Sequence, residues 1–329
     1  MQWPLLDRRG ILSAFASTLL TPSLSLAQDK YPNRPITLLL PYAAGGGTDT
    51  IARVFAKHLE DKLGGTIIVD NRPGGAGVIA TEATGNAKPD GHTLLIGNQG
   101  PMVVTPHLVQ KTKADPELVL DPVALIADAP LVIVVGPKQP VKSLADLIAT
   151  AKAKPDELNY ASASNGSASH LAAVLLDRAA GITTRHVAYR GAGPALNDLV
   201  GGHVDFMITT VPSAIGLIEA GKLTALAVTG SKRMDILPNV PTADEAGLAG
   251  YTASTWYGLM APKGLPGAIR VILEAAVADV LQRPELLARL KDDGATPSGM
   301  KSEAFGRFMA EERKRWGAVV QAANISLKD

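Results

Sequence analysis

A repeated order of apolar strand, turn and amphipathic helix constrains the fold of this 329-residue chain more than any other feature. Residues 36–40 are apolar enough for a buried strand, and residues 50–63 carry their apolar positions on one face of a helix. Further apolar runs at 66–69 and 93–97 follow, with a turn and a helical pattern between them. This alternation is typical of a parallel sheet that helices cover on both faces. We therefore expect an α/β fold with mostly parallel sheets.

Two apolar runs predict that the chain crosses between two lobes. Residues 123–135 are almost wholly apolar, but Pro130 argues against one uninterrupted central strand, so we interpret the run as a crossing. Strand and helix patterns then alternate again, and residues 255–261 are interpreted as the return crossing. The chain length also favours two domains. We expect one lobe from residues 28–128 and 256–329, a second lobe from 129–255, and a hinge at the crossings.

The first 27 residues have the pattern of a secretory leader, or signal peptide. Arg8 and Arg9 precede an apolar stretch at 11–20, and Ser25-Leu26-Ala27 resembles a signal-peptidase site. The stretch is too short for a bilayer span. Twin-arginine export is an alternative, but the motif around the arginines is incomplete, so general secretion is favoured. We expect cleavage near Ala27 and a location in the periplasm.

Charge and cysteine content exclude several kinds of site. The leader contains one acidic and two basic residues of the chain's 31 and 32, so the remainder is neutral overall. A neutral protein shows no sign of a basic face for nucleic acid. A bound anion must therefore be held by local geometry and not by the overall charge of the protein. The absence of cysteine excludes thiolate metal ligands and cysteine nucleophiles.

The turn after the first strand is the strongest candidate for a binding site. Residues 41–49 read Pro-Tyr-Ala-Ala-Gly-Gly-Gly-Thr-Asp and lead into a helix. We expect Gly45, Gly46 and Gly47 to adopt left-handed backbone angles, which allow a close approach to a ligand. The first N–H groups of a helix lack intrahelical partners and carry the positive end of its dipole. The turn therefore predicts an anion site, and Gly46→Val is expected to abolish binding without unfolding the protein.

Two turns of the expected second lobe repeat this pattern with other residue types. In residues 162–170 hydroxyls replace glycines, and serine or asparagine can cap a helix or donate to a carboxylate. Residues 190–194 place Pro194 where a first helical turn accepts it. Each turn alone is better explained as a plain connection. Several at the carboxyl ends of strands in two lobes favour a binding site between the lobes.

Other motifs give little support to an enzyme. Residues 216–222 have phosphate-loop spacing, but Leu223 replaces the magnesium-binding hydroxyl and the segment ends a helix. Residues 75–80 resemble a dinucleotide fingerprint that is separated from its strand. The six histidines form no close metal-ligand pair. Ser167 with His170 is the remaining hydrolase alternative, although this spacing serves helix capping as readily. We expect no catalytic site and no metal.

A series of motifs in order along the chain carries a family resemblance over residues 30–325. The motifs include Tyr31-Pro-x-Arg-Pro-Ile, Pro41-Tyr-x-x-Gly-Gly-Gly-Thr-Asp, Val69-Asp-Asn-Arg-Pro-Gly, Ser162-x-x-x-Gly-Ser-x-x-His-Leu and Trp256-Tyr-Gly-Leu-x-Ala-Pro. Together they resemble the substrate-binding proteins of tripartite tricarboxylate transporters, the Bug receptor family. The resemblance implies a two-lobed, type II periplasmic binding protein that closes like a Venus flytrap on a carboxylated metabolite. It further implies delivery to membrane permease subunits and no cofactor.

The resemblance also assigns site residues. The family's first carboxylate loop matches residues 41–49, where backbone N–H groups and ordered waters hold one carboxylate, and its second-lobe loop matches 162–170. Asp205 is expected to fix a loop nearby. Ala43 and Ala44 replace a proline of many relatives, which leaves pocket shape and ligand open. The expected ligand-binding residues are Tyr42, Ala44, Gly45, Gly46, Gly47, Thr48, Asp49, Asn98, Gly100, Ser162, Ser164, Asn165, Gly166, Ser167, His170, Arg190, Gly191, Asp205 and Thr210.

Two functions of such a receptor stay open at this point. The closed form either feeds transport through the permease or signals to a membrane sensor kinase. We expect a monomer with a small-molecule carboxylate ligand and no nucleic-acid partner. Citrate, other di- or tricarboxylates, amino acids, aromatic acids and even neutral compounds all fit the sequence.

Overall fold

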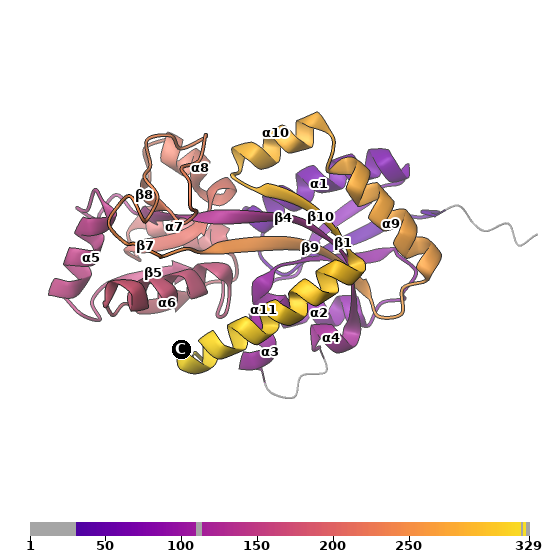
Figure 1. Ribbon diagram of the computed structural model, residues 1–329, viewed down its shortest axis with the longest axis horizontal. Helices are drawn as coiled ribbons and strands as arrows, with labels where there is room; N and C mark the ends of the chain where they lie inside the picture. Colours follow the sequence, from indigo (N-terminus) through magenta and orange to yellow (C-terminus); the bar gives the residue numbers. More distant parts are fainter. Residues whose placement is uncertain (1–30, 110–113, 324, 327–329) are drawn as a thin grey trace, which may run out of the picture. The chain divides into compact units, whose positions relative to one another are not determined.

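Two antiparallel strands, β4 (Leu120–Val135) and β9 (Ser254–Pro262), connect the two halves of the protein (Figure 1). The computed structural model describes residues 31–109, 114–323 and 325–326, so the expected leader lies outside the described residues. From Leu120 to Pro130, β4 pairs with β9, and from Leu131 onward it pairs with strands of a second sheet. One strand therefore belongs to both sheets.

The first sheet has the order β2, β1, β3, β9, β4, with β10 beside β4. β1 (Ile36–Leu40) lies parallel to β2 (Ile67–Asn71) and β3 (Thr93–Gly97), whereas β9, β4 and β10 (Thr296–Lys301) pair in antiparallel fashion. Successive side chains of a strand point to opposite faces. Accordingly, Leu38 and Leu40 pack in one buried cluster and Leu39 in another.

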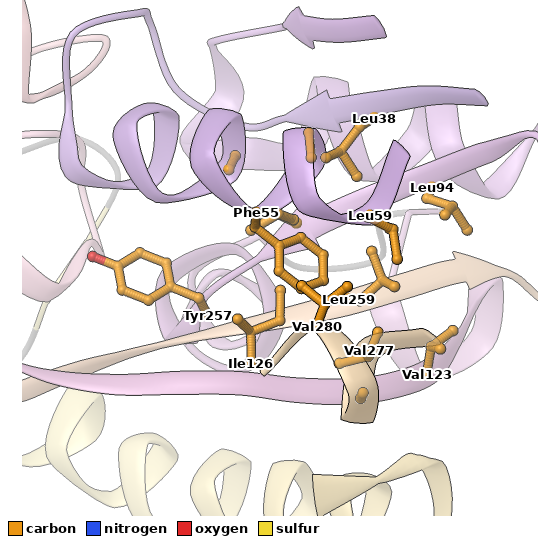
Figure 2. Close-up of a cluster of buried hydrophobic side chains, with 14 of the residues drawn as sticks. Leu38, Phe55, Leu59, Leu94, Val123, Ile126, Tyr257, Leu259, Val277 and Val280 are labelled. Atoms are coloured by element: carbon orange, nitrogen blue, oxygen red, sulfur yellow. The ribbon is translucent and has the colours of Figure 1, made fainter. Parts of the chain in front are cut away.

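Helices cover both faces of the first sheet. One face packs against α1 (Gly47–Leu63), α9 (Gly267–Val280) and α10 (Pro284–Asp292) through the cluster drawn in Figure 2. The other face packs against α2 (Val78–Gly85) and α11 (Ser302–Ala322). Four short helical segments lie between these elements: η1 (Gly75–Gly77), η2 (Gly100–Val104), α3 (Thr105–Leu108) and α4 (Pro116–Val119).

The second sheet joins the end of β4 to β7, β5 and β6, with β8 on the other edge of β4. Its strands are β5 (Asn159–Ser162), β6 (Arg185–Ala188), β7 (Phe206–Thr210) and β8 (Thr224–Val228). β5, β6 and β7 are parallel, and β4 is antiparallel both to β7 and to β8, so β8 runs in the same direction as β5, β6 and β7. Its helices are α5 (Leu144–Ala153), α6 (Ala168–Ala180), α7 (Ala192–Gly201) and α8 (Val211–Glu219).

The α/β fold with two lobes is confirmed, but the expected break at Pro130 is wrong. β4 continues through this proline as a sixteen-residue strand. Pro130 is the last residue that pairs with β9, and Leu131 is the first that pairs with β7. A proline is tolerated there because the strand changes its neighbours and loses little from a missing N–H donor.

No helix in the described part of the chain has the length and apolar content of a membrane span.

Candidate functional site

A small cavity lies where the two lobes meet. Its volume is about 50 Å³, and none of the described side chains that line it is charged. Loops at the carboxyl ends of β1, β3, β5 and β7 contribute to it, together with the starts of α1, α7 and α8, and with β9. The lining residues are Tyr42, Gly46, Gly47, Thr48, Asn98, Leu131, Ala163, Ser167, Ala168, Ser169, Ala192, Thr209, Thr210, Ser213, Thr255 and Tyr257.

The glycine loop at residues 41–49 is folded by its own acid. The Asp49 carboxylate accepts the Gly45 N–H at 3.1 Å and forms an ion pair with Arg53 at 2.9 Å. Burial acts to raise the pKa of Asp49, but the hydrogen bonds from Arg53, Gly45 and Asn71 hold it below its ordinary value. Asp49 therefore stays ionised and fixes the loop, and it does not line the cavity.

The backbone angles of the three glycines differ from the expectation. Gly45 alone has a positive φ, of +82°, whereas Gly46 is extended with a φ of −94° and Gly47 is the first residue of α1. The argument that Gly46 needs a left-handed conformation is therefore wrong. A Cβ atom on Gly46 would lie 3.4 Å from the Ala192 side chain, an ordinary contact.

Gly47 makes the closest contact with the second lobe. Its N–H donates to the Ser213 hydroxyl at 2.6 Å, and that hydroxyl lies 2.7 Å from the Thr210 hydroxyl. A Cβ atom on Gly47 would overlap the Thr210 hydroxyl and come within 3.2 Å of the Tyr257 hydroxyl. Only glycine fits at this position while the lobes are together.

A second backbone contact joins the lobes at the edge of the cavity. The Ala43 N–H donates to the Arg190 carbonyl oxygen at 2.9 Å. Beside it, Cβ atoms on Gly191 and Gly193 would lie 2.9 Å from the Ala43 nitrogen and 2.7 Å from the Ala44 carbonyl oxygen. The loop before α7 therefore packs directly on the backbone of the glycine loop.

The Tyr42 and Asn98 side chains form the polar floor of the cavity on the first lobe. The Tyr42 hydroxyl donates to the Asn98 amide oxygen at 3.1 Å, and the Asn98 amide nitrogen donates to the Thr48 hydroxyl at 3.4 Å. Burial raises the pKa of Tyr42 far above its ordinary value. The phenol therefore stays protonated and able to donate.

The serine loop at residues 162–170 uses most of its hydroxyls within itself. Ser162 and Ser167 both donate to the Ser164 carbonyl oxygen, and Ser169 accepts the Ala163 N–H at 2.9 Å. Ser167 is also the N-cap of α6, and the His170 Nδ1 accepts the Gly166 N–H. Of the expected residues in this loop, Ser167 alone lines the cavity.

A larger cleft of about 450 Å³ adjoins the cavity, and three more of the expected residues line it. Ser164, Asn165 and Arg190 line it, and Tyr42 borders both spaces. Several expected residues line neither space, namely Ala44, Gly45, Asp49, Gly100, Ser162, Gly166, His170, Gly191 and Asp205. Most of them shape the loops and the contact between the lobes.

Asp205 lies at the wrong end of its strand for a ligand contact. It precedes β7, whereas Thr210 at the other end of β7 lines the cavity. Its carboxylate accepts the Asn159 N–H at 2.7 Å and a hydrogen bond from Gln139. Asp205 thus links the start of β5 to the residue before β7. This contact agrees with the loop-fixing role and not with the inclusion of Asp205 among the ligand residues.

Ser213, Thr255 and Tyr257 line the candidate site but were not among the expected ligand residues. Ser213 lies in the first turn of α8 after a strand end, so the rule applied to the other turns also covers it. Thr255 and Tyr257 face the cavity from β9, and the Thr255 hydroxyl is buried without a hydrogen-bond partner among the described residues. Figure 2 shows the Tyr257 hydroxyl pointing away from the aliphatic cluster. Alternation along β9 was the available signal.

A cleft of about 780 Å³ lies elsewhere between the lobes and has a different character. Its charged side chains include Lys291, Arg233 and Arg315, and these form ion pairs with Asp235, Glu245 and Glu312. Within the residues that the structure describes, no group of acidic or histidine side chains is arranged for a metal ion. The small cavity therefore remains the best candidate site.

Comparison with known proteins gives consistent matches. The family model for the tripartite tricarboxylate transporter family receptor matches residues 51–325. BugT of Bordetella pertussis is 38% identical over 308 residues, which cover 92% of this chain and 93% of BugT. A Rhodopseudomonas palustris protein solved with adipate is 36% identical, with a TM-score of 0.86 over 90% of this chain and 99% of that one. MatC of the same species, solved with bound malate, is 35% identical, with a TM-score of 0.81 over 88% and 100%.

Proposed function

The chain belongs to the tripartite tricarboxylate transporter receptor family, and on this premise we propose that it captures a small carboxylated metabolite between its lobes. It then delivers the ligand to the membrane permease subunits of such a transporter. Two relatives of similar fold were solved with adipate and with malate, both of which are carboxylates. The signalling alternative gains no support from these relatives.

The observation that carries the proposal is the set of uncharged donors that both lobes present to one cavity. The Gly47 N–H at the start of α1 and the Thr210 and Ser213 hydroxyls lie together there. A carboxylate accepts hydrogen bonds from such groups, and the positive end of the helix dipole favours it further. These groups suit an anion that is bound through the geometry of its hydrogen bonds and not through an oppositely charged side chain.

Magnitudes explain why both lobes are needed. Micromolar affinity corresponds to about 8 kcal/mol, whereas a helix terminus contributes roughly 0.3–1 kcal/mol and up to about 2 when partly buried. Hydrogen bonds to a charged group add roughly 1.5–3 kcal/mol each. Several donors must therefore act together. Because the closed cavity has only about 50 Å³, we propose that the ligand enters while the lobes are apart and that bending of β4 and β9 closes them.

We further propose the location and the lobe boundaries. Cleavage near Ala27 would release a monomeric receptor into the periplasm. The lobes would consist of residues 28–128 with 256–329 and of residues 129–255, so that they meet where β4 changes partners. The hydrolase alternative is not favoured, because the Ser167 hydroxyl donates to the Ser164 carbonyl and the His170 Nδ1 accepts a backbone N–H.

A thermal-shift screen against mono-, di- and tricarboxylates tests the proposed function, with calorimetry to measure each affinity. A ligand at 100 times its dissociation constant is expected to add about 2.7 kcal/mol to the free energy of unfolding. Neutral analogues of the same carbon skeleton serve as controls and should give no shift. If no carboxylate binds, or if the neutral analogues bind as well, the proposal is wrong.

A further inference from the structure

We propose that Met234 is an affinity-determining residue outside the ligand cavity, because it opposes opening of the lobes from the other edge of the strand β4. The inference rests on the proposed closure of the lobes and adds a residue that contacts no ligand. It follows from the positions of two spaces on the two edges of one strand.

β4 separates the small cavity from the 780 Å³ cleft. One edge of β4 pairs with β9 and then, from Leu131 onward, with β7, and residues of β9 and β7 line the cavity. The other edge pairs with β10 and then, from Val132 onward, with β8. Residues 229–235, which follow β8, and residues 294–297, at the start of β10, line much of the cleft. The two spaces therefore lie on opposite edges of the strand that connects the lobes.

Bending of β4 and β9 changes the two spaces in opposite directions. A bend in the plane of the sheets that separates the lobes on the cavity edge brings β10 towards β8 on the other edge. Opening of the ligand cavity therefore narrows the 780 Å³ cleft. A side chain that already fills the gap on this edge opposes the opening.

Met234 is such a side chain. It is 6% exposed and belongs to the buried cluster of the second lobe that includes Val132 and Leu237. Its methyl group occupies the position that a Cβ atom on Gly294 of the first lobe would take. Gly294 has a φ of +69° and lies between α10 and β10. Because the two residues are already in contact, the lobes cannot approach further on this edge unless Met234 moves.

An ion pair crosses the same edge but is expected to contribute little. Lys291 of α10 lies 2.8 Å from Asp235, and the two side chains are 70% and 73% exposed. Solvent and salt screen a pair of this kind. The pair joins the same two segments as Met234 and Gly294, so it provides a matched control.

The test measures closure directly, in the protein without ligand. The chain contains no cysteine, so Ile68→Cys and Arg185→Cys allow spin labels to be attached at these two positions alone. Both positions are exposed, and they lie on β2 and β6, the strands furthest from β4 on the cavity side of each sheet. The distance between the labels grows as the cavity opens. Pulsed electron paramagnetic resonance would therefore give the ratio of closed to open molecules.

Five variants of the labelled protein would be compared with it. Met234→Ala removes the contact with Gly294, Met234→Leu keeps most of the side-chain volume, and Lys291→Gln removes the exposed ion pair. Ser231→Trp adds bulk at an exposed position that lines the cleft. Ala149→Trp adds the same side chain at an exposed position of α5 that lines neither space.

We expect Met234→Ala to lower the ratio of closed to open molecules by about tenfold and Ser231→Trp to raise it. Met234→Leu, Lys291→Gln and Ala149→Trp should change it little. Every carboxylate that binds should lose affinity for Met234→Ala by the same factor, because the residue contacts no ligand. Thermal unfolding would establish that each variant folds. Ser231→Trp leaves the buried cluster intact, so it tests the inference even if Met234→Ala does not fold.

Three results would overturn the inference. In the first, neither Met234→Ala nor Ser231→Trp changes the distances between the labels; in the second, Lys291→Gln opens the lobes as much as Met234→Ala does; in the third, Ala149→Trp closes them as much as Ser231→Trp does. The carboxylate screen is a separate measurement. A failure of that screen would remove the proposed function and leave the result on closure unchanged.

Discussion

The glycine loop at residues 41–49 and the serine loop at 162–170 line one cavity from opposite lobes, but they are held in opposite ways. The glycine loop is fixed at its flank, where Asp49 accepts the Gly45 N–H and pairs with Arg53. Its Gly47 N–H is thereby left to contact the other lobe. The serine loop is fixed from within, since its hydroxyls bond to its own carbonyl and N–H groups.

A hydroxyl that is already hydrogen-bonded within its own loop is therefore not automatically available to donate to a ligand. The second lobe opposes Gly47 with Thr210 and Ser213 at the start of α8, and not with the serine loop. The glycine loop thus recognises through its backbone, while the serine loop mainly provides a wall.

The largest expected effect is at Gly47. Gly47→Val should weaken ligand binding by about ten- to a hundredfold, because the new side chain overlaps the Thr210 hydroxyl and prevents full closure at a cost of roughly 1–3 kcal/mol. Calorimetry with the best carboxylate of the screen would measure the loss. Thermal unfolding in the absence of ligand should change little, because the residue lies at the junction of the lobes and not in a core.

Gly46→Ala is the matched control for this change. Its φ of −94° suits alanine, and the added Cβ meets only the Ala192 side chain at ordinary distance. We expect nearly wild-type affinity. Equal losses at both glycines would mean that the whole turn, and not the Gly47 contact, controls binding, and the comparison of the loops would need revision.

A pair of serines separates the two roles at smaller magnitude. Ser213→Ala should lower ligand affinity by a factor that corresponds to about 1 kcal/mol, because the closed form loses the acceptor of the Gly47 N–H. Ser167→Ala should instead lower the free energy of unfolding by about 1 kcal/mol, because α6 loses its N-cap. Denaturant unfolding and calorimetry on both variants would measure the two quantities. The reverse pattern would assign ligand recognition to the serine loop.

The elements of the fold were largely predictable because their patterns are local. The helix expected at residues 50–63 corresponds to α1, since its apolar positions lie on one buried face and Gly64 ends it in a left-handed conformation. β10 was missed because Thr-Pro-Ser-Gly-Met-Lys has no apolar alternation and is stabilised by pairing with β4. Pro130 was misread because a sequence does not reveal where a strand changes its neighbours.

The candidate site was predictable as a set of loops but not as a set of contacts. Strand ends followed by helix starts indicated the turns at residues 41–49, 162–170 and 190–194. Whether Ser167 or Ser213 faces Gly47 depends on how the lobes meet, which is a tertiary property. For the same reason Tyr257 was interpreted as part of a crossing, although alternation along β9 directs its hydroxyl to the cavity.

The smallest expected effect concerns two aspartates, one in α1 and one in α6. They lie at opposite ends of their helices. Asp49 lies in the first turn of α1, where the dipole favours an anion, and Asp177 lies near the end of α6, where the dipole opposes one. Burial, with a smaller effect from Asp156, raises the pKa of Asp177 from 3.8 to about 6, against the hydrogen bonds from Thr184. The pKa of Asp49 is instead held below its ordinary value.

These shifts predict opposite pH dependences. Folded Asp177 binds a proton more tightly than the unfolded chain does, so its contribution to stability grows as the pH falls from about 6 towards 3.8 and is absent above 6. Ionised Asp49 stabilises the fold above its ordinary pKa, and this contribution is lost as the pH falls through the lower folded value. Melting temperatures between pH 7 and 4 should therefore include a gain that Asp177→Asn removes and Asp49→Asn retains. We expect about 1 kcal/mol or less, because Asp177 is only partly buried and solvent screens the remainder. A wild-type profile that Asp177→Asn leaves unchanged would show that this carboxyl titrates as it does in the unfolded chain.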